Sequence, residues 1–400
     1  MNTAWFRSEL TYCTNVHAGE NLVQVSKIVN GPLTTIRRNR GLSSMAAGLW
    51  LSHPTAVELS SAENLQRFSG ELDKNGITLF TLNGFPAQGF HSPRVKEAVY
   101  HPDWSEAERL AYTIKLAHIL AGLLPHDVAE GTISSVPLGF APDWDKKRHS
   151  RAMDALSQCL VEFEKIHLQS GRRIRLCLEM EPGCVLESTN DLIPFFTTEL
   201  PQHFISRDLD PNLIKQYLGI CFDVCHQAVM FEDTYKALTR IHDAEINIGK
   251  IQISSALELK TPNDKHARDS LAGFVEQKYL HQSRCMGDNN RLFEVMDLDL
   301  AFTTFPVNHA WRTHFHVPIQ AETLISDGLG TTQGEICRTL DYLRDHPELH
   351  PHLEVETYTW TALPKQIRPK DENTMVDGLC TELRWLEAQM LSRGLLQDEP

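Results

Sequence analysis

The chain has 400 residues, and its 52 Asp and Glu outnumber its 38 Lys and Arg to give a formal net charge of −14. This charge argues against a nucleic-acid partner, because a phosphate-binding surface needs concentrated Lys and Arg. A hydrophobic content of 42% is typical of a globular chain with a proper core, and no apolar run is long enough to predict a membrane span. Nine cysteines without close pairs, and an N-terminus without signal-peptide features, predict reduced thiols and a cytoplasmic setting.

Eight short segments rich in β-branched and apolar residues follow one another along the chain, most of them before a stretch with helical periodicity. Several are continuous apolar runs, as in parallel strands that are covered on both faces. Polar residues gather at their C-terminal ends, where the active site of a (β/α)8 barrel lies. We therefore predict an α/β fold, a single (β/α)8 TIM barrel over residues 1–400. Its strands are expected at 11–17, 47–52, 77–84, 131–139, 174–182, 219–226, 250–255 and 352–360.

Two of the intervening helices have clear signals. The stretch 105–125 begins with Ser105 and Glu108 as a capping box and ends at Pro125. Its predicted inward stripe is Leu110, Ile114, Ala117, Ala121 and Leu124. The stretch 373–394 predicts the last helix, with Gly394 as its C-cap.

One region is too long for a simple strand-helix unit. Nearly a hundred residues separate the segments KIQISS and HLEVE, where a few tens are enough. Within this region QKYLHQSRC and THFHVPI look like additional strands, which could form a hairpin. We predict an insertion after the seventh strand, at about residues 256–320, that acts as a lid or as an oligomer contact.

Polar residues at the ends of the later strands form the predicted site. Glu179, Asp223, Gln252 and Glu356 end or follow strands five to eight. Adjacent barrel strands lie about 4.8 Å apart, so these side chains can converge on one point. Carboxylates with a nitrogen or amide-oxygen ligand suit a divalent ion such as Mn²⁺, Mg²⁺, Co²⁺ or Zn²⁺, and without a cation they would raise one another's pKa.

Plainer interpretations exist for each residue alone. A single strand-end Asp or Glu is more often a helix N-cap or an ion-pair partner than a metal ligand. His226 alone could be an ordinary loop histidine. The CxxxC spacing of Cys221 and Cys225 is typical of small core residues, because structural zinc sites use tighter spacing. The coincidence of acids on three strands favours a functional site.

The sequence resembles the xylose-isomerase-like TIM-barrel superfamily of sugar phosphate isomerases, epimerases and endonuclease IV. The resemblance lies in the LxLE strand, the DxxH after the sixth strand and the last strand with its Glu, and Arg109 stands where many members carry an Arg. A closer resemblance is to the EboE-type metabolite traffic proteins of bacterial secondary-metabolite clusters. It is carried by the strings TYCTNVH, LFTLNGFP, VKEAVYHPDW, SSVPLGF, LEMEPGCVLE, YLHQ, HFHVPI and LEVETYTW.

The superfamily's site residues can be transferred one at a time. Its first metal-binding Glu falls on Glu179, with Glu181 as the rival, and its metal-binding Asp falls on Asp223. Its substrate-binding His falls on His226. Its last Glu falls on Glu356, with Glu354 as the rival.

The strand-seven position usually held by a metal-binding His is Gln252 here, which is a departure from the family. An amide oxygen is a weaker ligand than imidazole for zinc or cobalt. His281, His314 or His316 from the insertion could compensate.

The resemblance implies a metal-dependent isomerase or epimerase of a sugar, cyclitol or polyol-like metabolite. One of Glu179 and Glu356 would remove the proton α to a carbonyl and the other would return it. The side chains expected to bind substrate hydroxyls or to lie beside the substrate are Asn15, His17, Asn83, Glu181, His226 and His316, of which the first three could instead be turn or cap residues. Arg312 could bind a phosphate group or lie on the surface. Homo-oligomers are common among relatives with this barrel.

Two other functions remain open at this level. A non-catalytic metabolite-binding or trafficking protein on the same barrel would bind its ligand without exchanging substrate protons, and Gln252 favours it. An endonuclease IV-like phosphodiesterase would need a histidine-rich zinc site and a basic surface, against which the charge of −14 counts. The sequence has no GxxxxGK[ST] loop, GxGxxG turn or GxSxG elbow, so nucleotide-dependent and serine-hydrolase chemistry is not expected.

Overall fold

The structure is a computed structural model that describes residues 4–397 and 399, with the backbone alone at 326 and 327. Eight strands form one sheet in the order β2-β15-β8-β7-β6-β5-β4-β3, and the neighbours in this order pair in parallel. Each predicted segment overlaps one of these strands, so the predicted (β/α)8 barrel is confirmed. The strands are β2 (Thr11–Tyr12), β3 (Met45–Trp50), β4 (Ile77–Asn83), β5 (Glu130–Ser135), β6 (Arg173–Glu179), β7 (Leu218–Asp223), β8 (Ile248–Ile253) and β15 (His352–Val355).

The barrel is closed between its first two strands by side chains as well as by backbone. One parallel bridge joins Cys13 to Gly48. Beside it, the Thr11 hydroxyl accepts a hydrogen bond from the Gly48 N–H at 3.0 Å, and the Thr14 hydroxyl accepts one from the Trp50 N–H at 2.9 Å. These hydroxyls supply the acceptors that the short strand β2 lacks, because buried N–H groups need partners.

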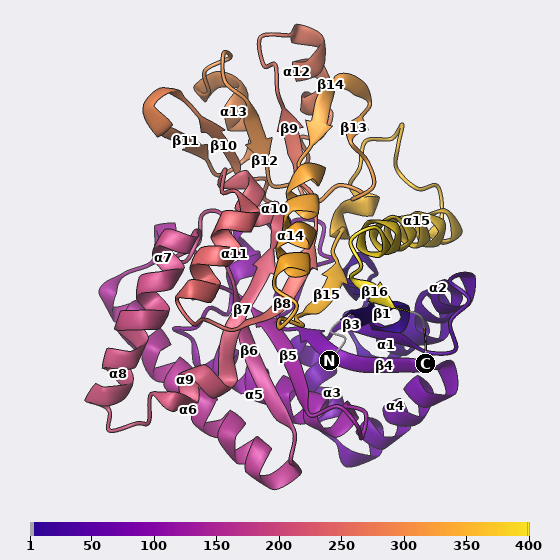
Figure 1. Cartoon of the computed structure of the whole chain (residues 1–400), viewed down its shortest axis with the longest axis vertical. Helices are drawn as coiled ribbons and strands as arrows, with labels where there is room; N and C mark the ends of the chain where they lie inside the picture. Colours follow the sequence, from indigo (N-terminus) through magenta and orange to yellow (C-terminus); the bar gives the residue numbers. More distant parts are fainter. Residues whose placement is uncertain (1–3, 398, 400) are drawn as a thin grey trace.

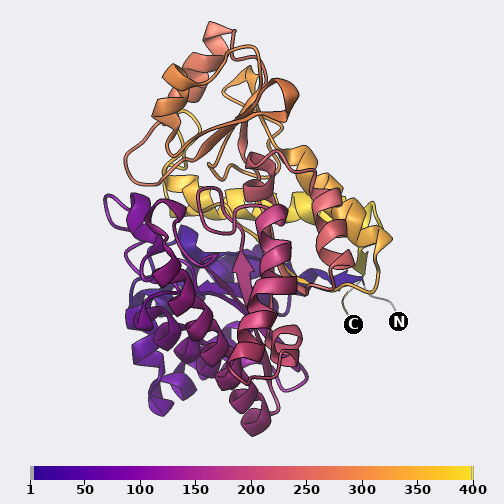
Figure 2. The same ribbon diagram turned by 90° about the vertical axis from the view of Figure 1, so that its left-hand side faces the viewer.

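Helices surround the barrel, which occupies the lower part of Figures 1 and 2, and α15 runs between the barrel and a second sheet above it. The helix α15 matches the predicted last helix, and Gly394 beyond it has a φ of +71°. The helices that follow or precede the barrel strands are α1 (Leu22–Ile28), α2 (Thr34–Asn39), α3 (His53–Leu59), α4 (Ala62–Asn75), α5 (Ala107–Leu123), α6 (Lys146–Ser170), α7 (Thr189–Pro194), α8 (Leu200–Ser206), α9 (Asn212–Tyr217), α10 (Val224–Val229), α11 (Thr234–Asp243), α14 (Gln333–Asp345) and α15 (Glu372–Leu391).

Helix α5 differs from its prediction at its start and in its buried face. Its N-cap is Glu106, and the Ser105 hydroxyl makes no hydrogen bond with any described residue, so the predicted Ser105–Glu108 capping box was wrong. The predicted inward residues Leu110, Ile114 and Ala121 are only half-buried, whereas Arg109 and Tyr112 are fully buried. Arg109 and Tyr112 are buried because their side chains donate hydrogen bonds to backbone carbonyls of the loops beside the helix. A hydrophobic pattern in the sequence cannot reveal such bonds.

The long segment after β8 folds into a second, antiparallel sheet in the order β11-β10-β12-β9-β14-β13. The stretch THFHVPI contributes only Thr313 to a strand, so its histidines follow the strand instead of lying within it. The predicted partner QKYLHQSRC contributes three residues to β10, which pairs with β12. The elements of this segment are β9 (Leu257–Leu259), α12 (Lys265–Ala272), β10 (Ser283–Met286), β11 (Leu292–Val295), α13 (Leu298–Thr304), β12 (Trp311–Thr313), β13 (Thr323–Leu324) and β14 (Ser326–Thr331).

The insertion is fastened to the loop between β4 and α5. The Lys278 carbonyl accepts hydrogen bonds from the N–H groups of Val95 and Lys96 at 2.7 and 3.0 Å. The buried Lys96 ammonium forms an ion pair with Asp297 at 2.6 Å and donates to the Glu276 carbonyl at 3.2 Å. These contacts hold the second sheet over the carboxyl ends of the barrel strands, which is the catalytic face of this architecture.

Candidate functional site

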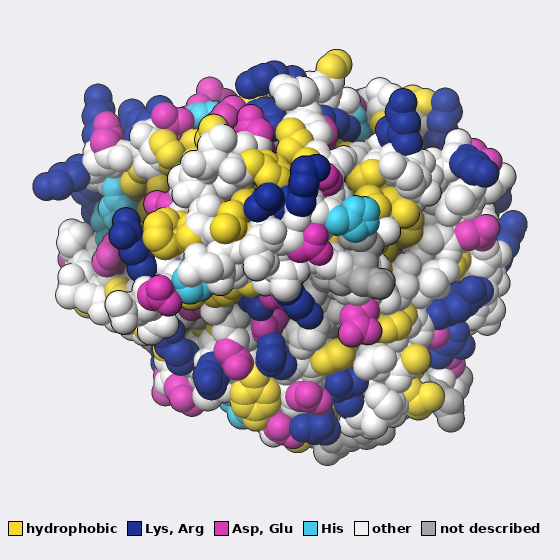
Figure 3. All heavy atoms as spheres, turned by 90° about the horizontal axis from the view of Figure 1, so that it is seen from above, with side chains coloured by type: hydrophobic (Ala, Val, Ile, Leu, Met, Phe, Trp, Pro, Cys, Tyr) yellow, Lys and Arg dark blue, Asp and Glu magenta, His cyan; other side chains and the backbone are white. Residues whose placement is uncertain are grey.

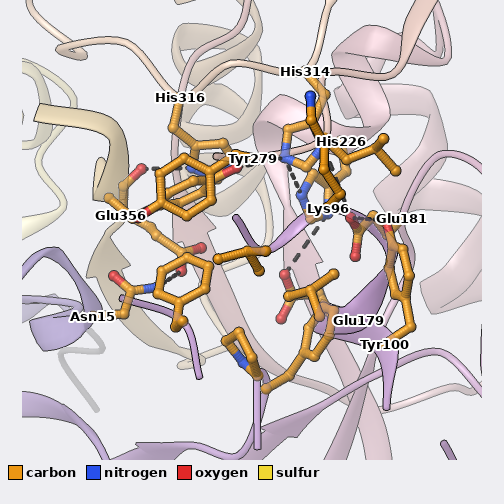
Figure 4. A pocket seen from close by; sticks show the side chains of 17 residues that line it. Asn15, Lys96, Tyr100, Glu179, Glu181, His226, Tyr279, His314, His316 and Glu356 are labelled. Atoms are coloured by element: carbon orange, nitrogen blue, oxygen red, sulfur yellow. Dashed lines mark hydrogen bonds and ion pairs between the residues drawn. The ribbon is translucent and has the colours of Figure 1, made fainter. Parts of the chain in front are cut away.

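A pocket with about 490 Å³ of empty space lies at the carboxyl ends of the barrel strands, beneath the insertion. Polar side chains form part of its lining (Figure 4), and the loop after β4, the insertion and the segment after β15 add apolar and aromatic ones. Its lining residues are Asn15, Phe85, Pro86, Phe90, Val95, Lys96, Val99, Tyr100, Glu179, Glu181, His226, Tyr279, Leu280, His314, His316, Glu356 and Tyr358.

Glu179 and Glu356 reach this pocket from strand β6 and from the residue directly after β15. Both side chains are buried. Burial raises the pKa of Glu179 well above its ordinary value, and the carboxylates of Glu356 and Asp223 raise it further. Burial and Asp223 likewise raise the pKa of Glu356, whose Oε1 accepts a 2.7 Å hydrogen bond from the Asn15 amide. The two carboxyl groups therefore share one environment in which ionising both is unfavourable.

Asp223 ends strand β7 and caps the short helix α10. Its Oδ1 accepts hydrogen bonds from the His226 N–H at 2.8 Å and from the Ser254 hydroxyl at 2.9 Å. Its Oδ2 is buried and has no hydrogen-bond partner among the described residues. Oδ1 therefore has the N-cap role that a strand-end Asp often has, whereas Oδ2 takes no part in the cap.

The insertion brings His316 to this free oxygen. The Nδ1–H of His316 donates to the Glu356 carbonyl at 2.8 Å, because a carbonyl can only accept. Its Nε2 therefore carries a lone pair, lies 3.9 Å from Asp223 Oδ2, and is itself without a hydrogen-bond partner in the described part of the chain. Burial lowers the pKa of His316 to about 4, which keeps the ring neutral. A neutral imidazole oriented by a carbonyl is the arrangement found in metal-binding histidines.

A second cluster joins Glu181, His226 and His314 on another side of the pocket (Figure 4). The Nε2 atoms of the two histidines are 3.1 Å apart, and ring centroids lie 4.5 Å apart. Glu181 Oε1 accepts a 2.8 Å hydrogen bond from the Tyr100 hydroxyl. Burial raises the pKa of Glu181.

Three of the predicted residues lie deeper, in the barrel interior. Glu354 forms a 2.9 Å ion pair with Lys250 and accepts from the Asn83 amide at 3.0 Å, and Asn83 also accepts from Lys250 at 2.8 Å. Gly48 leaves room for this carboxylate, since a Cβ there would lie 1.3 Å from Glu354 Oε2. Gln252 Oε1 accepts from the Cys221 thiol at 3.2 Å. Asn83, Gln252 and Glu354 are not among the residues that line the pocket.

The remaining predicted residues are placed outside the pocket. His17 pairs with the Tyr12 hydroxyl at 3.0 Å, and burial lowers its pKa to about 3. Arg109 donates to the carbonyls of Pro102 and Gly84. Arg312 pairs with Glu258 at 2.9 Å, and His281 with Glu276 at 2.8 Å.

The basic side chains near the pocket do not balance its negative charges. Glu179, Asp223 and Glu356 are buried together. Lys250 lies beneath them and Lys96 lines the pocket, but Lys250 already pairs with Glu354 and Lys96 with Asp297. This arrangement suits a divalent cation, with carboxylate oxygens and an imidazole nitrogen as ligands.

Several contributors to the site could not be singled out from the sequence. Tyr100, Gln282 and Tyr358 lie in strings that carry the family resemblance, but neither spacing nor composition marks them as site residues. Their positions depend on how the insertion and the loop after β4 fold over the barrel. His314 and His316 had a signal, the HFH stretch, without a defined place.

No protein-family model matches the sequence, and no curated protein matches it. Among solved structures, the xylose isomerase domain protein from Planctomyces limnophilus is 13% identical, with 97% of this chain and 98% of that chain covered and a TM-score of 0.49. A D-tagatose 3-epimerase-like protein is 12% identical, with 96% and 98% covered and a TM-score of 0.47. The IOLI protein, described with a zinc atom, is 12% identical, with 93% and 98% covered and a TM-score of 0.41. At these levels of similarity, the assignment of chemistry rests on the residues of this chain.

The face of the molecule seen from above carries charges of both signs (Figure 3). Seen from above, Lys and Arg side chains are interspersed with Asp and Glu (Figure 3). The described part of the chain contains no helix with the length and apolar character needed to cross a membrane. All nine cysteines are unpaired.

Proposed function

We propose that this chain is a metal-dependent isomerase or epimerase of a small sugar, cyclitol or polyol-like metabolite. The observation that carries the proposal is the buried group of Glu179, Asp223 and Glu356. Glu179 and Glu356 line the pocket, Asp223 lies behind them without lining it, and the lysines nearby are paired elsewhere. Carboxylates that share a site in this way hold protons near neutral pH or bind a cation, and both properties serve proton transfer next to a carbonyl.

The proposed cation ligands are Glu179, Asp223, His316 and Glu356. The fit is supported by the free Asp223 Oδ2 and the His316 Nε2 lone pair, 3.9 Å apart. His316 takes the role that we first expected of Gln252, whose amide oxygen accepts from Cys221. A divalent cation at this place supplies Lewis acidity to the oxygens of a bound carbonyl and its neighbouring hydroxyl.

Glu179 and Glu356 are the proposed acid and base. The Asn15 amide donates to Glu356, and a hydrogen bond to the charged form favours the carboxylate there. Glu356 therefore accepts the proton from the carbon next to the carbonyl, and Glu179, whose pKa is raised by burial and by Glu356, returns a proton as the acid. A base works best when its pKa lies near the working pH, and burial raises the pKa of both carboxyl groups above the ordinary value.

The pocket limits the substrate to a small molecule. The empty space of about 490 Å³ at the pocket includes space that is open to solvent. The insertion and the loop after β4 cover it, and their contacts through Lys96 and Lys278 support a lid role for the insertion. Such a cover excludes water from the reacting carbon.

We place this activity in the context of the EboE-type metabolite traffic proteins, in a reducing, cytoplasmic compartment. The support is the set of strings quoted above, from TYCTNVH to LEVETYTW, together with the nine unpaired cysteines. We also propose that the chain forms homo-oligomers.

Proton exchange tests the proposal directly. Protein loaded with Mn²⁺, Co²⁺ or Zn²⁺ is incubated in D₂O with a panel of ketoses, aldoses and keto-cyclitols, and deuterium at carbon is followed by NMR. We expect incorporation at the carbon next to the carbonyl of at least one compound. Glu179→Gln and Glu356→Gln should each reduce the rate by about 10²–10⁴-fold, the usual contribution of a general acid or base.

A matched control is Glu232→Gln, a carboxylate held by Thr189 away from the pocket, which should leave the rate unchanged. Ligand binding without any deuterium incorporation would overturn the isomerase and favour the second candidate, a non-catalytic metabolite-binding protein. Equal rates in the Glu179 and Glu356 variants and in the parent would remove these residues from the mechanism.

A further inference from the structure

The histidine pair at the side of the pocket has an unusual arrangement of lone pairs. His226 Nδ1 lies 2.9 Å from the Met180 carbonyl, and His314 Nδ1 lies 2.7 Å from Gln282 Oε1. Both partners are acceptors, so each ring carries its proton on Nδ1 and a lone pair on Nε2. Those two Nε2 atoms face each other at 3.1 Å.

The orientation of Gln282 is fixed by its other contacts, which makes the assignment of His314 secure. The Gln282 amide nitrogen donates to the Pro182 carbonyl at 2.9 Å, and a carbonyl cannot donate in return. The same nitrogen lies 2.6 Å from the Tyr100 oxygen. The oxygen of the amide must therefore face His314.

Two facing lone pairs repel unless a proton or a cation lies between them. A shared proton would make one of these two buried rings an imidazolium, and an unpaired charge is costly to bury. The Tyr358 hydroxyl is 3.5 Å from His314 Nε2, too far for a strong hydrogen bond. A cation is the better partner.

The spacing of the two nitrogens fits a metal ion. Zinc–nitrogen bonds are about 2.0–2.1 Å, so two imidazoles on a tetrahedral zinc place their nitrogens about 3.3 Å apart. The observed 3.1 Å is close to this separation.

Glu181 supplies a third ligand atom. Its Oε1 is held by Tyr100 at 2.8 Å and by Gln282 at 3.2 Å, while its buried Oε2 has no hydrogen-bond partner among the residues described. Ligand atoms of Glu181, His226 and His314 all lie within 4.8 Å of one another. The nearby Cys225 is a weaker candidate, because burial and Asp223 raise the pKa of its thiol.

We propose that Glu181, His226 and His314 bind a second divalent cation, with Zn²⁺ or Co²⁺ as the best match, separate from the cation assigned to Asp223 and His316. Two imidazoles and one carboxylate form the ligand set of zinc sites that keep a fourth position open for water or substrate. All three residues line the pocket, so the open position takes an oxygen donor of the bound ligand, a hydroxyl or carbonyl. Gln282 and Tyr100 orient the ligands, as outer partners do in metal sites.

Cation binding tests this site independently of catalysis. Protein purified without a metal-binding tag is stripped with a chelator, titrated with Co²⁺ while its visible absorption is recorded, and then analysed for bound metal. We expect about two cations per chain in the parent and about one in His314→Ala and in Glu181→Gln. Asp223→Asn should also bind one, and its remaining Co²⁺ should keep the absorption of the histidine site. His352→Gln, at a half-buried histidine at the opposite end of the barrel, is the control and should bind two.

The outcomes separate this proposal from the proposed function. Full binding in His314→Ala and Glu181→Gln, with folding verified by circular dichroism, would overturn the second site and leave the first intact. A single cation lost in both His314→Ala and Asp223→Asn would indicate one shared centre and would also overturn it. A single cation lost in His314→Ala but kept in Asp223→Asn would support the histidine site and remove the cation from the proposed isomerase.

Discussion

The interior and the mouth of the barrel both bury carboxylates, but they satisfy them differently. In the interior, Glu354 is matched by Lys250 and Asn83, and the Ser134 hydroxyl donates to Asn83 in turn. At the mouth, two residues further along the same strand, Glu356 has one amide partner and lies beside other buried acids. Burial is nearly complete in both places.

The difference lies in how many internal partners each buried carboxylate has. Buried charges are ordinarily paired and hydrogen-bonded, as in the interior network. The mouth keeps the lone oxygens of Asp223 and Glu181 and the lone nitrogen of His316. Such groups lower the stability of the fold, and their accumulation at the mouth of the barrel is the basis of the cation sites proposed above.

The largest expected effect comes from breaking the interior pair. Burial alone would lower the pKa of Lys250, but the Glu354 carboxylate raises it overall, so the ammonium is needed there as a charge. Lys250→Met leaves Glu354 buried without its counterion and should reduce the free energy of unfolding by about 3–5 kcal/mol. Chemical denaturation measures this loss. The double variant Lys250→Met/Glu354→Gln should recover part of it, and no loss in the single variant would show that the pair is not structural.

Replacing a buried acid at the mouth by a neutral side chain should instead stabilise the metal-free fold. In chelator-treated protein, Glu179 has a pKa raised above its unfolded value, so the folded state binds more protons and stability falls as pH rises through that interval. Glu179→Gln should therefore raise the free energy of unfolding at pH 8, by about 1–3 kcal/mol, and flatten its pH dependence. Denaturation at a series of pH values checks both. Destabilisation of the metal-free variant would mean that the mouth is satisfied internally, as the interior is.

A smaller effect is expected from the hydroxyl that orients Asp223. Ser254 donates to Asp223 Oδ1 at 2.9 Å and so fixes the direction of the free Oδ2. Ser254→Ala should weaken cation affinity at the Asp223 site by about 10–100-fold, as the loss of an outer partner does in other metal sites. Competition with a fluorescent chelator measures the affinity. Cation binding at His226 and His314 should not change, which makes the second site an internal control.

The smallest effect concerns a half-buried histidine at the amino-terminal end of the barrel. His352 pairs with the Thr132 hydroxyl at 2.8 Å, and burial lowers its pKa to about 4. The folded state therefore binds fewer protons than the unfolded chain, and the stability contributed by the neutral ring is lost as pH falls from about 6.5 to about 4. His352→Gln keeps a hydrogen-bonding side chain and should reduce this loss. An unchanged slope of unfolding free energy against pH would assign the acid sensitivity to other groups.

The barrel could be predicted from the sequence because its signals are local. Short segments rich in apolar and β-branched residues, with polar residues at their ends, recur eight times, and each overlaps one strand of the parallel sheet. The same logic predicts that Glu179, Asp223 and Glu356 approach one another, since the carboxyl ends of parallel strands meet at one end of a barrel. Helix α5 shows the limit of local signals, because buried Arg109 and Tyr112 are retained by loop carbonyls that come from other parts of the chain.

The strands and the acids at their ends could be located from the sequence, because the pattern of apolar and polar residues along a strand is a local property. Which of these acids has a buried counterion depends on side chains that come from other strands, so it became clear only in the folded structure. Glu354 lies within β15 and Glu356 directly follows it, and their environments differ because Lys250 forms an ion pair with Glu354 in the barrel interior whereas Glu356 lines the pocket. The positions of His314 and His316 depend on the insertion, which follows β8 in the chain and folds back over the barrel. There His316 lies beside Asp223, and His314 lies beside His226.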